Sequence, residues 1–457
     1  MNGDLGFREE DLCLLMDLYE LTMCASYFEN KRFEPATFDL FVRKLPPNRS
    51  YLLLAGLEHV LRFIEKFRFR DEHLEYLRRQ GFREDFLNYL RNFKFTGDVW
   101  AIPEGTVVFP NEPLIRVTAP IIEAQLLETF ILNTINLQTT IATKASRIVY
   151  AAKGRPVIEF GLRREHGIDA GMKVARASYI AGCIGTSNVL AGMKYGIPIF
   201  GTMAHSFIMF FGDEVASFKA FARTFPDKSI FLIDTFDTLK GAENAIKAAK
   251  ELEKNGFKLQ GVRLDSGDLA GLSKKVRRML NENGLNYVKI LASGDLDEYR
   301  IDELLNSGAE IDSFGVGTKL GTSADRPYVD IIYKLSEKMN DKGEFQPIMK
   351  LSEGKATLPG RKQVFRFKDE HGKFMRDVIA LEDEEVDGEP LLVKVIEKGN
   401  IIYDYPSIED IRKRALENLS RLPDKYKKLV RPAEYPVQIS LKLKKLMNDL
   451  ERRLKGV

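Results

Sequence analysis

The spacing of apolar residues alternates between two patterns from about residue 155 to residue 335. Short apolar runs that end in a charged residue, a hydroxyl or a glycine predict buried strands. The stretches between them, such as 238–255 and 269–283, carry apolar residues at helical spacing and begin near Asp, Ser or Thr. This alternation predicts a parallel α/β arrangement. The predicted strands begin at Ile158, Ile197, Ile230, Gly261, Ile290 and Phe314.

The residues that follow these strands are the first candidates for a functional site. In a (β/α) barrel, the loops at the carboxyl ends of the strands all converge on one place. The alternating span is short for a regular eightfold barrel, so we expect an irregular TIM-like (β/α) barrel at 151–335 that carries the chemistry.

The flanking regions predict two further domains. Residues 1–150 combine apolar strand patterns with a long helical tract at 121–152, which predicts an α+β domain. Residues 336–457 contain a basic, turn-rich stretch at 351–366 and are charged and helical from residue 408. We expect this last region to form a cap that packs on the N-terminal domain.

Composition and charge narrow the class of protein. The chain has 457 residues, of which 69 are basic and 66 acidic, so its formal charge of +3 does not favour nucleic-acid binding. Its three cysteines (Cys13, Cys24 and Cys183) are widely spaced and predict neither a disulfide framework nor a zinc site. No apolar run is long enough to span a membrane, and we expect a cytoplasmic protein.

Charged and glycine residues at the predicted strand ends suit an anionic, hydroxyl-bearing substrate. Arg163 and Arg263 offer planar forks for a carboxylate or a phosphate, although a lone arginine more often forms a structural ion pair. Asp265 and Asp295 can accept from ribose hydroxyls or hold Mg²⁺, or they can cap helices. Asp268 is expected mainly to be a helix cap. The glycine loop 315–318 is suited to bind a phosphate group through its backbone N–H groups.

His205 is the sharpest candidate, because it follows the apolar run 197–200 within the segment Gly-Thr-Met-Ala-His-Ser. A neutral imidazole can accept a phosphoryl group, and neighbouring hydroxyls of Thr202 and Ser206 could orient it. Asp234 is a candidate partner for this histidine or, equally, a helix cap. The alternative for His205 is a buried structural histidine.

Six motifs stand out along the chain: Asp17–Met23, Phe160–Arg164, Gly201–Ser206, Val262–Asp268, Gly315–Thr318 and Lys362–Val364. In this order they give the chain a resemblance to the nicotinate phosphoribosyltransferases, which spans about residues 11 to 366. The resemblance implies an enzyme that joins nicotinate to phosphoribosyl pyrophosphate, releases pyrophosphate, couples ATP hydrolysis and requires Mg²⁺. It also implies the barrel of the type II phosphoribosyltransferases and a homodimer with shared active sites.

The same resemblance implies a role for individual residues. His205 would be a phosphohistidine, Arg263 would bind the nicotinate carboxylate, and Arg163 would lie near the ring or phosphate. Phe160 and Tyr19 would sandwich the pyridine, with Tyr19 supplied by the second subunit, although both residue types are more often plain core residues. Asp265 and Asp295 would be catalytic. Thr202, Gly294, Gly317 and Thr318 would complete the substrate site, and the motifs assign no Mg²⁺ ligands.

Three alternatives remain at this point. A nicotinamide phosphoribosyltransferase is the nearest, but its Gly-Thr-Asp-Thr segment corresponds here to Gly185–Asn188, with neutral Ser187 in place of the carboxylate. We therefore expect the acid as substrate, unless Ser187 merely caps the following helix. The others are a barrel enzyme of unrelated chemistry, such as an aldolase or decarboxylase, and a catalytically silent binding homologue.

Overall fold

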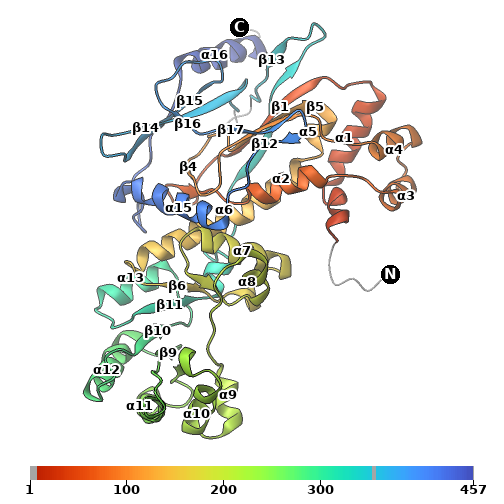
Figure 1. The fold of residues 1–457 in the computed structure, drawn as a ribbon. Coiled ribbons are helices and arrows are strands. Elements are labelled where there is room, and N and C mark those ends of the chain that lie inside the picture. Colours follow the sequence, from red (N-terminus) through yellow and green to blue (C-terminus); the bar gives the residue numbers. More distant parts are fainter. Residues whose placement is uncertain (1–7, 352–356, 456–457) are drawn as a thin grey trace. The chain divides into compact units, whose positions relative to one another are not determined.

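The protein forms two compact units in the computed structural model, which describes residues 8–351 and 357–455 (Figure 1). One unit consists of Met1–Thr139 with Tyr328–Val457, and the other of Thr140–Pro327. The domain boundaries predicted near residues 150 and 335 stay predictions. Residues 352–356 of the predicted turn-rich stretch lie outside the described residues. No helix in the described ranges is long and apolar enough to cross a bilayer.

The 140–327 unit is built on one parallel sheet of six strands, in the order β7-β6-β11-β10-β9-β8. Figure 1 labels four of them, β6, β11, β10 and β9. Every pairing in it is parallel, so the carboxyl ends of all the strands lie along the same edge. The predicted parallel α/β arrangement is confirmed. The strands are β6 (Val157–Glu159), β7 (Gly185–Thr186), β8 (Ile230–Leu232), β9 (Gly261–Leu264), β10 (Lys289–Ala292) and β11 (Ser313–Val316).

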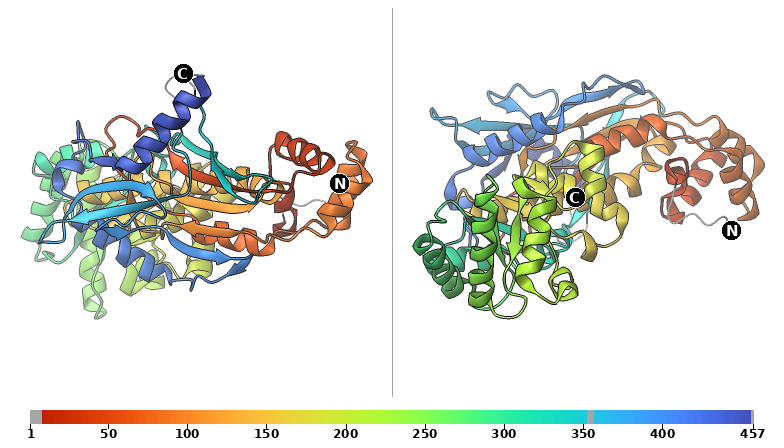
Figure 2. Two further views of the ribbon diagram at one scale, coloured as in Figure 1. Left: turned by 90° about the horizontal axis from the view of Figure 1, so that it is seen from above. Right: turned by 60° about the horizontal axis from the view of Figure 1, so that its bottom comes forward.

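Helices connect these strands, and the right-hand view of Figure 2 shows the green ones, which include α10 to α12, standing side by side. Four of them begin after an aspartate whose carboxylate accepts a backbone N–H three residues on: Asp213, Asp237, Asp268 and Asp297. The predicted cap at Asp268 is thus confirmed. The connecting elements are η2 (Leu162–Arg164), α7 (Ile168–Ile180), α8 (Val189–Tyr195), α9 (His205–Phe211), α10 (Glu214–Thr224), η3 (Pro226–Lys228), α11 (Thr238–Lys254), α12 (Leu269–Glu282), α13 (Glu298–Asn306) and α14 (Thr318–Gly321).

The prediction of a buried strand at 197–200 is wrong. Only Ile199 forms an isolated parallel bridge, to Thr186 of β7, and the side chains of Ile199 and Phe200 are 53% and 36% exposed. An apolar run predicts a strand by assuming that its side chains are buried, and here two of them face solvent. The histidine that follows is not in a strand-end loop but is the first residue of α9.

The other unit contains a seven-stranded sheet in the order β13-β12-β1-β5-β3-β17-β18. Strand β1 is almost fully buried, including the polar residues Thr37 and Asp39, and pairs antiparallel with β12 and β5. The strands of this sheet come from both ends of the chain. For example, β17 follows residue 390 and pairs with β3 from the N-terminal part. The strands are β1 (Pro35–Val42), β3 (Asp98–Ala101), β5 (Ile115–Pro120), β12 (Ile331–Met339), β13 (Phe345–Pro347), β17 (Val393–Glu397) and β18 (Asn400–Ile401).

A smaller sheet of four strands and a two-stranded sheet complete this unit. A buried ion pair between Arg366 and Asp377 joins strands of the smaller sheet, and Arg366 also donates to the backbone oxygen of Val107 at 2.8 Å. The strands are β14 (Lys362–Lys368), β15 (Phe374–Leu381), β16 (Glu389–Pro390), β19 (Val437–Ile439), β2 (Leu52–Leu53) and β4 (Val107–Val108).

Apolar side chains from the helices and the large sheet of this unit share one core, which includes Leu40, Val60, Leu87, Val99 and Val117. Helix α6 crosses the boundary at Thr139 between the two units. The helices are η1 (Glu9–Leu14), α1 (Leu18–Glu29), α2 (Leu57–Lys66), α3 (Asp71–Arg79), α4 (Glu84–Arg91), α5 (Ile121–Gln125), α6 (Glu128–Ala151), α15 (Ile408–Arg421), η4 (Asp424–Tyr426) and α16 (Leu441–Lys455).

Candidate active site

The carboxyl edge of the parallel sheet gathers most of the residues that the motifs single out. Strand register places Arg263 of β9 beside Leu232 of β8 and Leu291 of β10. The segments that leave this edge therefore start side by side in space, although they are far apart in sequence. They carry Phe160 and Arg163 after β6, Ser187 after β7, Asp234 after β8, Asp265 after β9, Gly294 and Asp295 after β10, and Gly317 and Thr318 after β11.

Arg263 is the centre of a hydrogen-bonded group at this edge. Its guanidinium donates to Ser293 Oγ at 2.7 Å, to Asp265 Oδ1 at 2.7 Å and to Thr202 Oγ1 at 3.2 Å. Ser293 also donates to Asp265 Oδ1 at 2.5 Å. The planar guanidinium thus ties together β9, β10 and the segment that precedes α9.

The Asp265 carboxylate is held ionised by this group. Burial opposes its charge, but the hydrogen bond from Ser293 and the charge of Arg263 outweigh that effect, so the pKa of Asp265 lies below its ordinary value. Its second oxygen, Oδ2, lies 3.9 Å from Nε2 of His205. One carboxylate oxygen therefore serves the arginine, while the other faces the histidine.

The Phe160 ring lies against Arg263, whose guanidinium carbon is 5.7 Å from the ring centroid. On the neighbouring strand β11, a Cβ atom at Gly315 would come within 2.5 Å of the ring, so this position has no room for a side chain. The ring and the guanidinium together present an aromatic face beside a fixed positive charge. Such a surface suits a flat, anionic ring.

The partner of His205 is a residue that the motifs did not indicate. Nδ1 of His205 lies 3.1 Å from Oγ1 of Thr235, and the imidazole is 40% exposed. Thr202, one of the two expected hydroxyls, instead accepts from Arg263, and Ser206 is exposed. The sequence feature that could have indicated Thr235 is its position directly after Asp234, at the exit of β8. A half-exposed, oriented imidazole remains accessible to a ligand.

Asp234 orients the neighbouring turn. Its Oδ2 accepts from the backbone N–H of Asp265 at 2.9 Å and from Ser266 Oγ at 2.6 Å. The alternative that Asp234 caps a helix is wrong, because Asp237 caps α11. Within the described part of the chain, its Oδ1 is buried and accepts no hydrogen bond.

Asp295 points out of the protein beside a strained glycine turn. A Cβ atom at Gly294 would lie 1.8 Å from the backbone oxygen of Asp265, and both Gly294 and Asp295 have positive φ, at 89° and 48°. The Asp295 side chain is 83% exposed and pairs with Lys319 Nζ at 3.1 Å. The alternative that Asp295 caps a helix is wrong, because Asp297 caps α13.

The remaining predicted residues are less tightly held. Arg163 is exposed on η2, and Gly317 and Thr318 stand at the start of α14, with Thr318 exposed. Ser187 donates its backbone N–H to the backbone oxygen of Glu159 at 2.9 Å. It does not cap α8, whose N-cap is Asn188, so that alternative is wrong. Tyr19 lies in the other unit on α1 and is 44% exposed.

One group of side chains in the other unit has metal-ligand types. Asp11, Glu72 and His73 place one possible ligand atom each within 4.8 Å of one another. The Arg8 guanidinium donates to both carboxylates at 2.9 Å, and His73 is buried between Asp11 and Cys13. The positive charge of Arg8 therefore occupies the place that a metal ion would take between the two carboxylates. His73 is a structural histidine.

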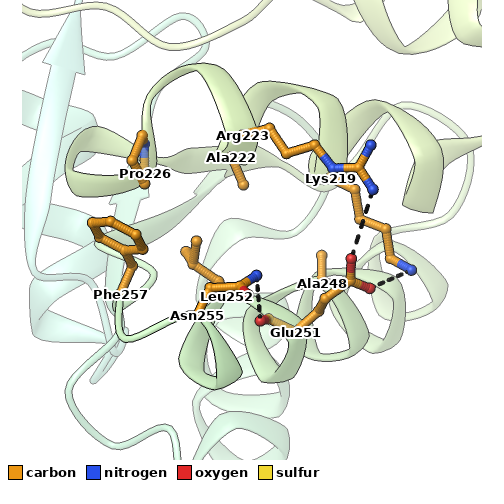
Figure 3. Close-up of a pocket in the computed structure, with 9 residues that line it drawn as sticks. All are labelled: Lys219, Ala222, Arg223, Pro226, Ala248, Glu251, Leu252, Asn255 and Phe257. Carbon is orange, nitrogen blue, oxygen red and sulfur yellow. Dashed lines mark hydrogen bonds and ion pairs between the residues drawn. The ribbon is translucent and has the colours of Figure 1, made fainter.

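A hollow of about 220 Å³ lies between α10 and α11 (Figure 3). Its floor is apolar, and at its rim Glu251 pairs with Lys219 at 2.5 Å and with Arg223 at 3.9 Å. It contains none of the candidate site residues. The hollow is lined by Lys219, Ala222, Arg223, Pro226, Ala248, Glu251, Leu252, Asn255 and Phe257.

Three family models match the chain in succession. They are the nicotinate phosphoribosyltransferase N-terminal domain at residues 14–136, the nicotinate phosphoribosyltransferase family at 156–365, and the nicotinate phosphoribosyltransferase C-terminal domain at 385–447. The central match contains all the strand-end residues described above.

Individual relatives agree with these matches. Nicotinate phosphoribosyltransferase pncB2 of Mycobacterium tuberculosis is 49% identical over 95% of this chain and 93% of its own. The nicotinate phosphoribosyltransferase of Bacillus subtilis is 42% identical over 96% of this chain and 94% of its own. The crystal structure of human nicotinic acid phosphoribosyltransferase superposes with a TM-score of 0.85 at 30% identity, covering 95% of this chain and 99% of that one.

These likenesses confirm the expected architecture, which is the α/β fold of the type II phosphoribosyltransferases with N- and C-terminal domains. They also confirm the resemblance that the six motifs indicated. The matches cover nearly the whole of this chain and of each relative, so the likeness is not confined to the central α/β region. With its strand-end residues inside the central match, the chain belongs to the nicotinate phosphoribosyltransferase family.

Proposed function

We propose that this chain transfers the phosphoribosyl group of phosphoribosyl pyrophosphate to nicotinate, giving nicotinate mononucleotide and pyrophosphate, and couples ATP hydrolysis to this transfer through His205. Family membership supports the transfer reaction. The observation that carries the site assignment is the group formed by Arg263, Asp265 and Ser293, which places a fixed cation and a carboxylate side by side at the sheet edge.

Phosphoribosyl transfer passes through an oxocarbenium-like centre while an anionic pyrophosphate leaves. The Arg263 fork stands against the Phe160 ring and suits the carboxylate of nicotinate stacked there. The ionised Asp265 offers an acceptor for ribose hydroxyls and a negative charge near the developing cation. Gly294, Gly317 and Thr318 lie in turns whose backbone can approach the phosphoribosyl group closely.

The histidine step supplies the energy coupling. A neutral imidazole nitrogen of His205 attacks the γ-phosphorus of ATP, the bond from that phosphorus to the bridging oxygen breaks, and ADP leaves. Water later cleaves the nitrogen–phosphorus bond and releases phosphate. Thr235 orients the ring through Nδ1, and the ionised Asp265 lies near Nε2.

Mg²⁺ fits the donor chemistry of this edge, because carboxylate oxygens are its preferred protein ligands. Asp265 Oδ2 is not taken up by Arg263, and the Asp295 carboxylate is 83% exposed beside Lys319. These two groups would hold the ion, which when bound neutralises phosphate charge. Asp234 Oδ1 is a further buried oxygen beside them.

The exposed apolar surface of α8 and α9 supports a homodimer. On α8, Val189 and Met193 are 67% and 75% exposed, and on α9, Met209 and Phe210 are 56% and 90% exposed, so each helix presents large apolar side chains to solvent. A second copy of the chain is the proposed partner, and its Tyr19 would complete the pyridine site. The cytoplasmic location stays a prediction.

A mixture of two inactive variants should regain activity if the site is shared. After subunit exchange, half of the dimers formed by Tyr19→Ala and Arg263→Ala chains are hybrids, and one of their two sites is intact. Pyrophosphate release should then reach about a quarter of the unaltered activity. A mixture of Arg263→Ala and Asp265→Ala should stay inactive, because both changes lie at the same sheet edge. No recovery in the first mixture after verified exchange counts against a shared site.

The identity of the pyridine is tested by competition. The unaltered enzyme should release pyrophosphate with nicotinate and strongly prefer it to nicotinamide, because Arg263 favours an anionic ring substituent and Ser187 carries no charge. Ser187→Asp should lower the preference by roughly ten- to a hundredfold, since a carboxylate there repels the acid.

Ser187→Asn is the matched control, because it adds similar bulk without charge and should keep the preference for the acid. Comparable turnover of nicotinamide by the unaltered enzyme would overturn the substrate assignment. Absence of pyrophosphate release with either pyridine would instead support a silent binding homologue.

A further inference from the structure

Two buried carboxyl groups lie beneath the turn that carries Phe160 and Arg163. Glu159 is the last residue of β6, and its side chain is fully buried. Its Oε2 accepts from Thr186 Oγ1 at 2.6 Å, and its Oε1 accepts from the backbone N–H of Gly161. Glu159 therefore links the exit of β6 to the exit of β7.

Glu165 follows η2 and brings a second carboxyl group against the first. A Cβ atom at Gly161 would lie 2.6 Å from Oε1 of Glu165 and 3.0 Å from Oε1 of Glu159, so the two carboxyl groups are neighbours. Among the described residues, neither oxygen of Glu165 accepts a hydrogen bond. Two ionised carboxylates cannot face each other in a buried place. One proton between them turns the repulsion into a short, charge-assisted hydrogen bond.

Three glycines enclose the Glu165 carboxyl group. A Cβ atom at Gly161 or at Gly321 would lie 2.6 Å from its Oε1, and one at Gly171 would lie 3.0 Å from its Oε2. These glycines come from the turn after β6, from α14 and from α7. The carboxyl group thus occupies a space that exists because three separate segments carry no side chain at that point.

Burial and the neighbouring carboxylate of Glu159 keep the Glu165 carboxyl group neutral near pH 7. Burial and the adjacent charge of Glu159 raise the pKa of Glu165 to about 9, and burial also raises the pKa of Glu159. Two charged side chains of the packed helices pair elsewhere: on α7, Lys173 pairs with Asp169 at 2.6 Å, and on α14, Lys319 pairs with Asp295. Arg163 and Arg164 on η2 are exposed.

We propose that Glu165 is a positioning residue, and that a proton shared between its carboxyl group and that of Glu159 holds the 160–164 turn and α14 in the geometry that binds the pyridine. This inference rests on the proposed role of Phe160 in binding nicotinate. Loss of the shared proton places two negative charges together under the turn. The turn then moves away, and nicotinate binding weakens while the chemistry at bound substrate is less affected.

The KM for nicotinate should report this proton. In the unaltered enzyme it should be constant near neutral pH and rise about tenfold per pH unit above pH 9, with a smaller change in kcat. In Glu165→Gln the amide N–H donates to Glu159 at every pH, so the KM should stay flat through the same range. The control is Glu303→Gln. Glu303 is exposed on α13 and its carboxylate pairs with Arg300, so this variant should keep the alkaline rise in KM.

Gly321→Ala provides an independent variant, because its new methyl group displaces the Glu165 carboxyl group without removing it. Its KM for nicotinate should be raised at neutral pH by about ten- to a hundredfold. A flat KM in the unaltered enzyme, the same alkaline rise in Glu165→Gln, or an unaltered KM in Gly321→Ala overturns the inference. Absence of pyrophosphate release by the unaltered enzyme instead overturns the proposed function.

Discussion

His205→Ala should form no phosphoenzyme and hydrolyse no ATP, while it retains slow phosphoribosyl transfer that does not depend on ATP. Alanine has no nitrogen to accept the phosphoryl group, but the group around Arg263 does not need the imidazole for its own hydrogen bonds. The phosphoenzyme is measured after incubation with γ-labelled ATP, as label that is stable in base and lost in acid.

Two companion variants sharpen this test. His371→Ala removes an exposed histidine in the other unit, 78% of whose side chain is accessible, and should leave the phosphoenzyme unchanged. Thr235→Val keeps the shape of the side chain but removes its bond to Nδ1, and should slow phosphoenzyme formation by about tenfold. A phosphoenzyme of normal yield in His205→Ala would show that another residue accepts the phosphoryl group.

The strands of the parallel sheet were predictable because their signal is local. Runs such as those beginning at Ile230, Gly261 and Ile290 are apolar where they are buried and polar directly afterwards, so both the strand and its functional exit can be read from a few residues. The same rule failed at 197–200, where Ile199 and Phe200 are apolar but exposed.

Contacts between separate segments, and contacts made by the fold of a single turn, were not predictable. Thr235 meets His205 because the exit of β8 and the start of α9 converge at the sheet edge. Glu165 comes beside Glu159 because the chain turns back through η2, and no spacing in the sequence encodes either pair. Helix caps failed for a related reason: of several aspartates after each strand, the backbone conformation selects Asp237 and Asp297, not Asp234 and Asp295. The residues not chosen as caps are those left at the site.

Arg263→Lys should lower kcat/KM for nicotinate by about a hundred- to a thousandfold, although it conserves the charge. The guanidinium reaches Ser293, Asp265 and Thr202 at once from one plane, and it lies against the Phe160 ring. An ammonium is a single point charge and cannot hold three separate segments in register while also facing a carboxylate. The loss is measured as pyrophosphate release under substrate-limiting conditions.

Arg277→Lys is a closely matched control, because the two arginine side chains are 17% and 16% exposed and each pairs with an aspartate at 2.7 Å. Arg277 also donates to the backbone oxygen of Val288, just before β10 begins, so it serves the opposite end of that strand from Ser293. Its replacement should change kcat/KM less than about threefold. Equal losses in the two variants would mean that Arg263 only stabilises the fold. A large loss confined to Arg263→Lys would place the recognition of the acid at the carboxyl edge of the sheet.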